Sequence, residues 1–262
     1  MPDIMTTYTF LSAKPSIMNN KAPTSKRDQL FAELLTEPSQ FSFNESVVDV
    51  FPDMIQRSVP GYPTVVRMSG VLSEQYAKPN TCVYDLGCSL GESIRAAEIA
   101  LNDRDCELVG IDNSAAMINR ARETLGSTSK INWVLGDVTA MDYAQSSVVI
   151  MNFTLQFIPI ERRLALLTKI RNAMIPGGLL ILSEKLTMPD PEMDALMINL
   201  HHDFKRSQGY SDMEIAQKRD AIDNVLIPET AATHLDRLAS AGFSRTSIWF
   251  QCLNFASFIA VA

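Results

Sequence analysis

The chain of 262 residues carries a formal net charge of −7, and 46% of its residues are hydrophobic and 20% charged. This composition is typical of a globular protein, and the acidic balance argues against sequence-independent binding to nucleic acid, which requires a clustered basic surface. No apolar run approaches the length of a membrane span, and the N-terminus lacks the basic cluster and long apolar stretch of a signal peptide. We therefore expect no direct contact with nucleic acid or membrane.

The cysteines and histidines argue against a structural metal. Cys82, Cys88, Cys106 and Cys252 form no C-x-x-C pair, and the chain has three histidines, so standard zinc spacing is missing. Three of the cysteines lie in or beside apolar, strand-like segments, where buried free thiols are common. We expect no metal and a reducing, cytoplasmic setting.

The N-terminal part divides into two segments. Residues 1–25 contain several helix breakers and no sustained period, which indicates a flexible extension outside a single domain of residues 26–262. Within residues 41–76 apolar residues recur at helical spacing on both sides of Pro60-Gly61. This segment is predicted to form a helical cap ahead of the main fold.

From Thr81 onward, short apolar runs alternate with helical segments. This alternation is typical of a parallel sheet with helices on both faces. Ser114 is a suitable N-cap for the helix after the second run, and Pro176-Gly177-Gly178 is predicted to stop the helix that begins near Ile160. The apolar runs are TCVYDL, ELVGID, INWVL, SVVIMNF and GLLILSE.

The pattern changes after Glu184. Residues 186–227 are predicted to be a helical insertion, helical from about Pro191 to Asp223, and a further helix is expected near residues 231–240. The last two strands, SRTSIWFQ and NFASFIAVA, are too close in sequence for a crossover and must pair antiparallel. The prediction is an α/β fold with a seven-stranded, mostly parallel sheet that ends in an antiparallel hairpin.

The turn after the first strand admits two interpretations. Gly87-Cys88-Ser89-Leu90-Gly91 matches the G-x-S-x-G pattern of a hydrolase nucleophile and also suits a nucleotide-binding loop. A hydrolase needs an earlier strand to supply the oxyanion loop and a late histidine on a loop. Ser89 follows the first strand, and His234 lies inside the amphipathic run ATHLDRLASAG, where a surface helix position is expected. The nucleotide interpretation is favoured.

Polar residues stand at the carboxyl ends of four consecutive predicted strands, where ligands bind in a doubly wound sheet. Gly87 and Ser89 provide a tight turn, and Asp112 is placed to accept hydrogen bonds from both hydroxyls of a ribose. Asp137 is placed to accept from an adenine amine, and Asn152 ends the fourth strand. Since the loop lacks the third glycine of a dinucleotide fingerprint, a mononucleoside cofactor is favoured.

These motifs resemble class I S-adenosylmethionine-dependent enzymes, which implies a Rossmann-like methyltransferase fold. A closer resemblance covers residues 41–261 and is to the carboxy-S-adenosyl-L-methionine synthase family. The blocks that carry it are FPDMIQRSVPGY (51–62), VYDLGCS (83–89), IDNS (111–114), NFTLQF (152–157), LSEK (182–185), HHDFKR with GYS following (201–211), QKR (217–219) and WFQC with NF (249–255).

The resemblance implies that S-adenosyl-L-methionine is a substrate. Its activated methyl carbon is joined to a carboxylate released from prephenate, which gives carboxy-S-adenosyl-L-methionine and phenylpyruvate. The product then serves the modification of wobble uridine in tRNA, and the enzyme is implied to be a homodimer. The residues implied to line the cofactor are Tyr62, Gly87, Cys88, Ser89, Asp112, Asn113, Asp137, Val138 and Asn152.

Arg219 is implied to hold the new carboxylate, and a guanidinium can grip a carboxylate with two hydrogen bonds. The run EIAQKRDAI around it also fits a solvated, charged helix face. The block HHDFKR, with His201, His202, Lys205 and Arg206, likewise suits either a surface helix or a cationic pocket wall for a dianionic substrate.

The sequence leaves the general base open, with Tyr62 and the histidines as candidates by residue type only. It also leaves open two other functions. One is an ordinary methyltransferase that acts on a small acid. The other is a non-catalytic subunit that binds S-adenosylmethionine and partners an active enzyme.

Overall fold

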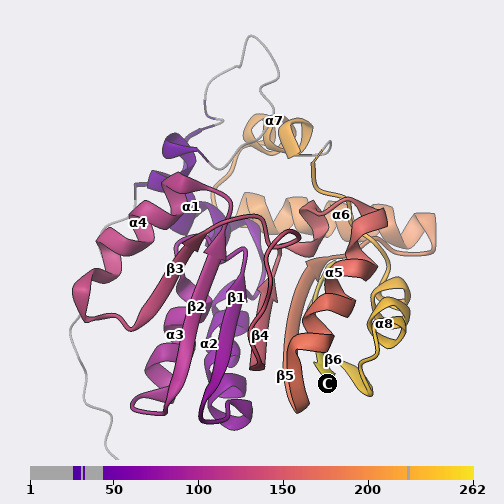
Figure 1. The fold of residues 1–262 in the computed structure, drawn as a ribbon. Helices are drawn as coiled ribbons and strands as arrows, with labels where there is room; N and C mark the ends of the chain where they lie inside the picture. The colour runs from indigo at the N-terminus through magenta and orange to yellow at the C-terminus, as the bar shows by residue number, and fades with distance from the viewer. Residues whose placement is uncertain (1–25, 31, 33–43, 223–224) are drawn as a thin grey trace, which may run out of the picture.

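The computed structural model describes residues 26–30, 32, 44–222 and 225–262; the predicted extension of residues 1–25 lies outside them. The described part contains a seven-stranded sheet in the order β3-β2-β1-β4-β5-β7-β6 (Figure 1). The strands are β1 (Thr81–Leu86), β2 (Cys106–Asp112), β3 (Ile131–Leu135), β4 (Ser146–Asn152), β5 (Met174–Lys185), β6 (Arg245–Cys252) and β7 (Phe255–Val261).

The pairing of the strands confirms the predicted fold class. β1 pairs parallel with β2 and β4, β2 with β3, and β4 with β5, whereas β7 runs antiparallel to both β5 and β6. The chain therefore has the Rossmann-like arrangement with a C-terminal antiparallel hairpin that its sequence predicted. The carboxyl ends of β1 to β5 all lie along one edge of the sheet.

Helices cover both faces of the sheet and bury two apolar cores. On one face α5 and α8 contribute Leu167 and Leu238, and on the other face α2, α3 and α4 contribute Leu72, Ala97 and Ile118. Burial on both faces explains why the inner strands read as continuous apolar runs. The helices are α1 (Glu45–Ser58), α2 (Tyr62–Tyr76), α3 (Glu92–Leu101), α4 (Ala115–Leu125), α5 (Ile160–Ala173), α6 (Pro191–Ser207), α7 (Asp212–Ile222) and α8 (Ala231–Ser240).

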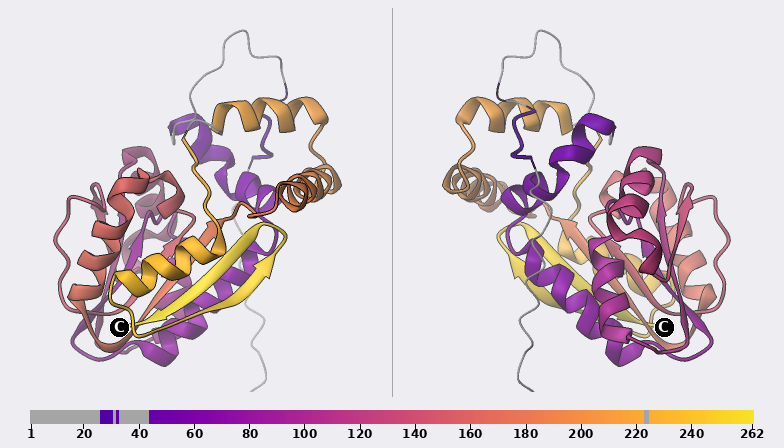
Figure 2. Two further views of the ribbon diagram at one scale, coloured as in Figure 1. Left: turned by 90° about the vertical axis from the view of Figure 1, so that its right-hand side faces the viewer. Right: turned by 90° about the vertical axis from the view of Figure 1, so that its left-hand side faces the viewer.

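Helices α1, α6 and α7 stand beyond the carboxyl edge of the sheet, away from its packed faces (Figure 2). The predicted helical run from Pro191 to Asp223 is thus two helices, and Asp223 lies outside the described residues. The break follows from Gly209, whose φ of +86° ends α6. The amide of Tyr210 then donates back to the carbonyl of Lys205, which is a glycine-based helix end.

The segment of residues 26–30 joins α1 to α7. The Asp28 amide donates to the Asp53 carboxylate of α1 at 2.8 Å. The Asp28 carboxylate accepts from the Tyr210 hydroxyl at 2.5 Å and lies 3.5 Å from the Lys218 ammonium. Because Asp28 is buried, these contacts fix α7 against α1 over the edge of the sheet.

Two local predictions are wrong. Pro176-Gly177-Gly178 does not stop a helix, because α5 ends at Ala173 and the glycines belong to β5, where they pair with the C-terminal residue Ala262. His234 is not on the surface. Its side chain is 1% exposed and its ring centroid lies 5.4 Å from that of Phe258, so it belongs to the inner face of α8.

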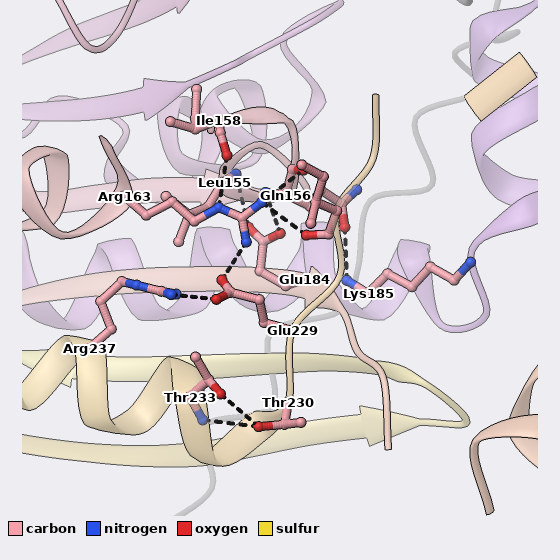
Figure 3. Close-up of polar contacts among 11 residues, drawn as sticks. Leu155, Gln156, Ile158, Arg163, Glu184, Lys185, Glu229, Thr230, Thr233 and Arg237 are labelled. Carbon is pink, nitrogen blue, oxygen red and sulfur yellow. Dashed lines mark hydrogen bonds and ion pairs between the residues drawn. The ribbon is translucent and has the colours of Figure 1, made fainter. Parts of the chain in front are cut away.

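A buried carboxylate fixes the short 3-10 helix η2 (Leu155–Phe157) that follows β4. Glu184 is fully buried on β5, and its two oxygens accept from the amides of Leu155 and Gln156 at 3.0 and 2.9 Å (Figure 3). The Gln156 side chain in turn accepts from the Lys185 amide at 2.9 Å. These bonds hold η2 against the carboxyl end of β5.

A buried ionic network continues from η2 to the end of the insertion (Figure 3). Arg163 on α5 is completely buried, forms an ion pair with Glu229, and donates to the carbonyls of Ile158 and Ile227 at 2.8 and 2.9 Å. Arg237 of α8 forms a second ion pair with Glu229. The network ties η2, α8 and the segment after α7 to one guanidinium.

Arg163→Ala is expected to lower the free energy of unfolding by about 3 kcal/mol or more, because it removes a fully buried guanidinium and leaves the largely buried Glu229 side chain with one of its two cationic partners. Arg162→Ala is the matched control. Arg162 is the preceding, exposed residue, and its removal should cost about 0.5 kcal/mol or less. Urea unfolding of both variants measures the difference, and equal losses would contradict a structural role for the network.

Candidate functional site

A cavity of about 290 Å³ opens at the carboxyl ends of the parallel strands, beneath α1, α6 and α7. It brings together nine of the ten predicted site residues; Arg219 is not among the lining residues. The nine that line the cavity are Tyr62, Gly87, Cys88, Ser89, Asp112, Asn113, Asp137, Val138 and Asn152.

The turn after β1 is held in one conformation. The amides of Gly87 and Cys88 both donate to the Ile111 carbonyl, at 2.8 and 2.9 Å. Gly87 has a φ of +75°, and a Cβ there would lie 2.2 Å from the Thr154 hydroxyl oxygen, so a larger residue does not fit. Ser89 also takes a left-handed φ, +49°. Strain at a non-glycine residue of this kind is common at ligand sites.

Asp112 joins the turns after β1 and β2. Its two carboxylate oxygens accept from the amides of Ser89 at 2.9 Å and Ser114 at 2.8 Å. Ser114 also caps α4, as predicted, by accepting from the Met117 amide. Each Asp112 oxygen keeps a further lone pair, so the carboxylate can hold both turns and still accept from ligand hydroxyls. Asn113 lies exposed at the rim.

Asp137 and Val138 form the next part of the wall, after β3. One Asp137 oxygen accepts from the amide and the hydroxyl of Thr139, each at 2.8 Å, and these bonds lower the pKa of Asp137. Asp137 therefore stays ionised and keeps its second oxygen for a ligand donor. Val138 is buried and provides an apolar surface.

Asn152 contacts protein on both ends of its side-chain amide. Its nitrogen donates to the hydroxyls of Ser69 and Ser93, at 3.2 and 3.0 Å, and its oxygen accepts from Ser183 at 2.7 Å. The side chain thus links β4 to α2, α3 and β5. Asn152 therefore has a structural role in addition to lining the cavity.

Two further carboxyl groups, which sequence analysis did not assign to the site, line the same half of the cavity. Asp85 is buried, accepts from the Ile94 amide at 3.1 Å, and has its pKa raised to about 7 by burial and the nearby Asp112. Glu92 lies beside the Tyr62 hydroxyl, and burial raises the pKa of both groups. This half of the cavity, with four carboxyl groups, favours a cationic ligand.

The opposite half is basic. Its lining includes Lys185 at the end of β5, His201 and Lys205 on α6, and Lys218 on α7. Ser58, the last residue of α1, binds two of them: its carbonyl lies 2.8 Å from His201 Nε2, and its hydroxyl accepts from Lys218 at 2.9 Å. Because a carbonyl only accepts, His201 donates through Nε2.

In each of the two charged clusters of the sequence, HHDFKR and QKR, some side chains line the cavity and others do not. His201 and Lys205 line the cavity, whereas Arg206 is exposed and paired with Asp203 and Asp212, so the pocket-wall hypothesis is wrong for Arg206. On α7 the exposed guanidinium of Arg219 pairs with Asp220 at 2.9 Å, as the solvated-face interpretation expects.

The adjacent Lys218 is buried, whereas Arg219 is exposed. Lys218 points inward and is 6% exposed. His202 does not belong to the lining either; partial burial, followed by the charges of Lys205 and Arg206, lowers its pKa.

The side chains considered as general bases are poorly suited to that role at neutral pH. Burial raises the pKa of Tyr62 well above its ordinary value. Burial and the charge of Lys205 lower the pKa of His201 to about 3, and burial lowers that of His234, which lies outside the cavity lining, to about 4. A base with so low a pKa drives proton abstraction weakly.

Within the described residues, no group of three or more His, Cys, Asp or Glu side chains is arranged to hold a metal ion. No helix in that part of the chain is both long and apolar enough to span a bilayer. All four cysteines are free thiols, and Cys82 and Cys88 are buried.

Comparisons with known proteins find relatives over most of the chain. A profile described as a methyltransferase domain matches residues 83–178. The curated carboxy-S-adenosyl-L-methionine synthase of Pseudomonas syringae pv. syringae (strain B728a) is 52% identical over 245 residues, which cover 91% of this chain and 99% of that protein. The protein of the same name from Geobacter sp. (strain M21) is 49% identical over 241 residues, 90% and 99% of the two chains. The chain belongs to the carboxy-S-adenosyl-L-methionine synthase family.

Solved structures place this member of the synthase family in a wider fold group. The crystal structure of human N-acetylserotonin methyltransferase in complex with SAM aligns with a TM-score of 0.57 over 83% of this chain and 56% of that chain. The two sequences are 14% identical, so the likeness concerns the fold. The chain thus has the class I methyltransferase fold that its motifs predicted.

The substitution Asp85→Asn tests whether the pKa of this carboxyl in the acidic half of the cavity is raised in the folded chain. The folded-state pKa of Asp85 is about 7, above its unfolded value. Between about pH 4 and pH 7 the folded chain therefore holds a proton on Asp85 that the unfolded chain has lost. The stability that this carboxyl contributes is therefore lost as pH rises through that window. Asparagine keeps an acceptor for Ile94 and does not titrate. The free energy of unfolding, variant minus wild type, should increase from about pH 5 to about pH 8.

Urea unfolding at several pH values measures this difference. Asp103→Asn, which removes one carboxyl group at an exposed surface position, is the control and should not reproduce the increase expected for Asp85→Asn. A pH-independent difference for Asp85→Asn would show that its carboxyl is not perturbed as described.

Proposed function

We propose that the protein converts S-adenosyl-L-methionine and prephenate to carboxy-S-adenosyl-L-methionine and phenylpyruvate. The observation that carries the proposal is the division of one cavity into an acidic and a basic half, in a chain about half identical to named synthases. A cationic sulfonium substrate and a dianionic partner need opposite charges side by side. We further propose a cytoplasmic enzyme whose product serves tRNA wobble uridine modification.

The residues of the acidic half fit S-adenosylmethionine. Asp112 has acceptor capacity for the ribose hydroxyls, and Asp137 with Val138 suits the adenine. Asp85 and Glu92 are placed to oppose the positive charges of the methionyl arm. When bound, S-adenosylmethionine supplies a methyl carbon whose C–H bond is exchanged for a C–C bond to the carboxyl carbon that prephenate loses.

The reaction balances without a side-chain base. Prephenate gives up a carboxyl group and its ring hydroxyl as it becomes aromatic, and the departing hydroxide takes the methyl proton to form water. This route agrees with the unsuitable pKa values of Tyr62 and His201. The protein then has to position the two substrates, oppose their charges and exclude bulk water, and α1, α6 and α7 cover the cavity for that purpose.

We propose a homodimer, and the surface of α6 supports it. Met193, Leu196 and Leu200 are exposed at helical spacing, so they form an apolar stripe on one side of α6. Contiguous exposed apolar side chains of this kind mark interaction sites. A second copy is the proposed occupant, and light scattering that gives the mass of a single chain would contradict this part of the proposal.

The role of Arg219 as the ligand of the new carboxylate remains part of the proposal. Its guanidinium is exposed and pairs with Asp220 in this structure, outside the cavity lining. A contact between Arg219 and the new carboxylate would distinguish the carboxylated product from S-adenosylmethionine, because the methyl group needs no charge partner.

The test of the function is mass analysis of the ligand after incubation with S-adenosylmethionine and prephenate. We expect a species heavier than S-adenosylmethionine by one carboxyl group, together with phenylpyruvate. Unmodified S-adenosylmethionine with no prephenate consumed would refute synthesis. Formation of S-adenosylhomocysteine and a methylated acid would instead indicate a methyltransferase.

Arg219→Ala extends the same experiment. Loss of a charge-assisted contact should weaken binding of the carboxylated product by about tenfold or more and leave the affinity for S-adenosylmethionine nearly unchanged. Titration calorimetry with both ligands measures this. Equal losses for the two ligands would place Arg219 away from the new carboxylate.

A further inference from the structure

A buried carboxylate from the N-terminal segment reaches the wall of the cavity. The segment of residues 26–30 contacts α1 and α7, and its Asp28 is 2% exposed. The Asp28 carboxylate lies 3.5 Å from the ammonium of Lys218, a residue of α7 that lines the cavity. Asp28 thereby holds a cation of the basic half, although none of residues 26–30 belongs to the lining itself.

Further contacts fix the position of Asp28. Its Oδ1 accepts from the Leu30 amide at 3.2 Å, and its Oδ2 accepts from the Tyr210 hydroxyl at 2.5 Å. The Asp28 amide donates to the Asp53 carboxylate of α1 at 2.8 Å. Because both carboxylate oxygens and the amide are bonded within the chain, Asp28 has one defined place beside α1. Lys218 is therefore held at a fixed position relative to α1 as well.

Two oxygens orient the ammonium of Lys218. One belongs to the Asp28 carboxylate, and the other is the hydroxyl of Ser58 at the end of α1, which accepts at 2.9 Å. An ammonium has three protons to donate. Among the described residues these two oxygens take two of them, which leaves the third for a ligand. Since Ser58 and Lys218 both line the cavity, that ligand would lie in the basic half.

The charge of Lys218 depends on its neighbours. Burial lowers the pKa of Lys218 to about 8, and Arg57 acts in the same direction, whereas Asp28 and Asp53 act against it. Asp28 is thus the main group that keeps the buried lysine charged near neutral pH. The charged and titratable groups that surround Lys218 are Asp28 itself, Asp53 and Arg57 on α1, Tyr210 before α7, and Lys185, His201 and Lys205 in the cavity lining.

We propose that Lys218 contacts the anionic co-substrate and that Asp28 is the residue that positions Lys218 for this contact. The inference rests on the proposed function, because it takes a dianionic second substrate. Pairing with Asp28 reduces the long-range attraction of Lys218 for an anion, but a direct, charge-assisted hydrogen bond to the ligand stays available. The cation is also oriented before the ligand arrives, so little side-chain entropy is lost on binding.

The pair gives co-substrate binding a defined pH dependence. Lys218 is charged below about pH 8 and loses its proton above that pH, so in the wild type the KM for prephenate should rise above pH 8. Asp28→Asn removes the charge that favours the ammonium. The rise should then begin at a pH lower by about one unit or more, which at pH 7.5 raises the KM about threefold or more. The kcat should change by less than about twofold, because the contact is one of binding.

Substitutions of Lys218 assign the pH dependence to this residue. Arginine stays charged, so Lys218→Arg should abolish the rise above pH 8. Lys218→Met should raise the KM about tenfold below pH 8 and show no further rise above it. Asp49→Asn is the matched control, since Asp49 also lies on α1 and pairs with a lysine, Lys26, but outside the cavity lining. Its pH profile should equal that of the wild type.

Calorimetric titration of phenylpyruvate over the same pH range repeats the test without turnover and separates the two proposals. A pH profile that Asp28→Asn leaves in place, or that persists in Lys218→Arg, would overturn the inference even if prephenate is consumed. Should phenylpyruvate bind with the pH dependence described and prephenate not be consumed, the inference stands and the proposed reaction fails. A wild type that binds neither compound overturns both. If Asp28→Asn does not fold, Ser58→Ala, which removes the other acceptor of the ammonium, should shift the profile in the same direction.

Discussion

The hydrogen bonds that Asp112 accepts from the amides of Ser89 and Ser114 hold the acidic half of the cavity together. They join the turns after β1 and β2, which the parallel register of these strands already brings to one edge. The bonds of Gly87 and Cys88 to Ile111 add a second link between the same turns. A buried carboxylate is stable only when it accepts hydrogen bonds. The same amides that stabilise the Asp112 carboxylate therefore also preorganise the site.

The basic half of the cavity is also held in place by buried charged groups, here of both signs. Glu184 fixes η2, and Arg163 connects η2 to Glu229 after the insertion, so that the wall beneath the insertion is anchored in the core. The acidic residues then follow the strand ends, while the cations come from β5 and the insertion helices. The fold shared with methyltransferases supplies the first set, and the insertion supplies most of the second.

The sequence predicted the sheet, and the cavity residues Gly87, Ser89, Asp112, Asp137 and Asn152, from local signals: apolar runs, caps, and polar residues at strand ends. The other four cavity residues, Tyr62, Cys88, Asn113 and Val138, were implied by the resemblance to the synthase family. Lys185 follows the same strand-end rule and could have been found by it. The inward Lys218 and outward Arg219 could not be distinguished, because α7 has no clear apolar face and its orientation is set by Asp28, far away in the chain. His234 was misplaced because its helix carries charged neighbours, although Phe258 covers the histidine itself.

Ser58 of α1 binds both insertion helices, His201 of α6 through its carbonyl and Lys218 of α7 through its hydroxyl. A displacement of either helix from the cavity therefore strains or breaks a contact at the same point. The positions of α6 and α7 are therefore coupled through Ser58, in addition to the contact of Asp28 with Lys218. A ligand that displaces one of the two helices is therefore expected to displace the other as well.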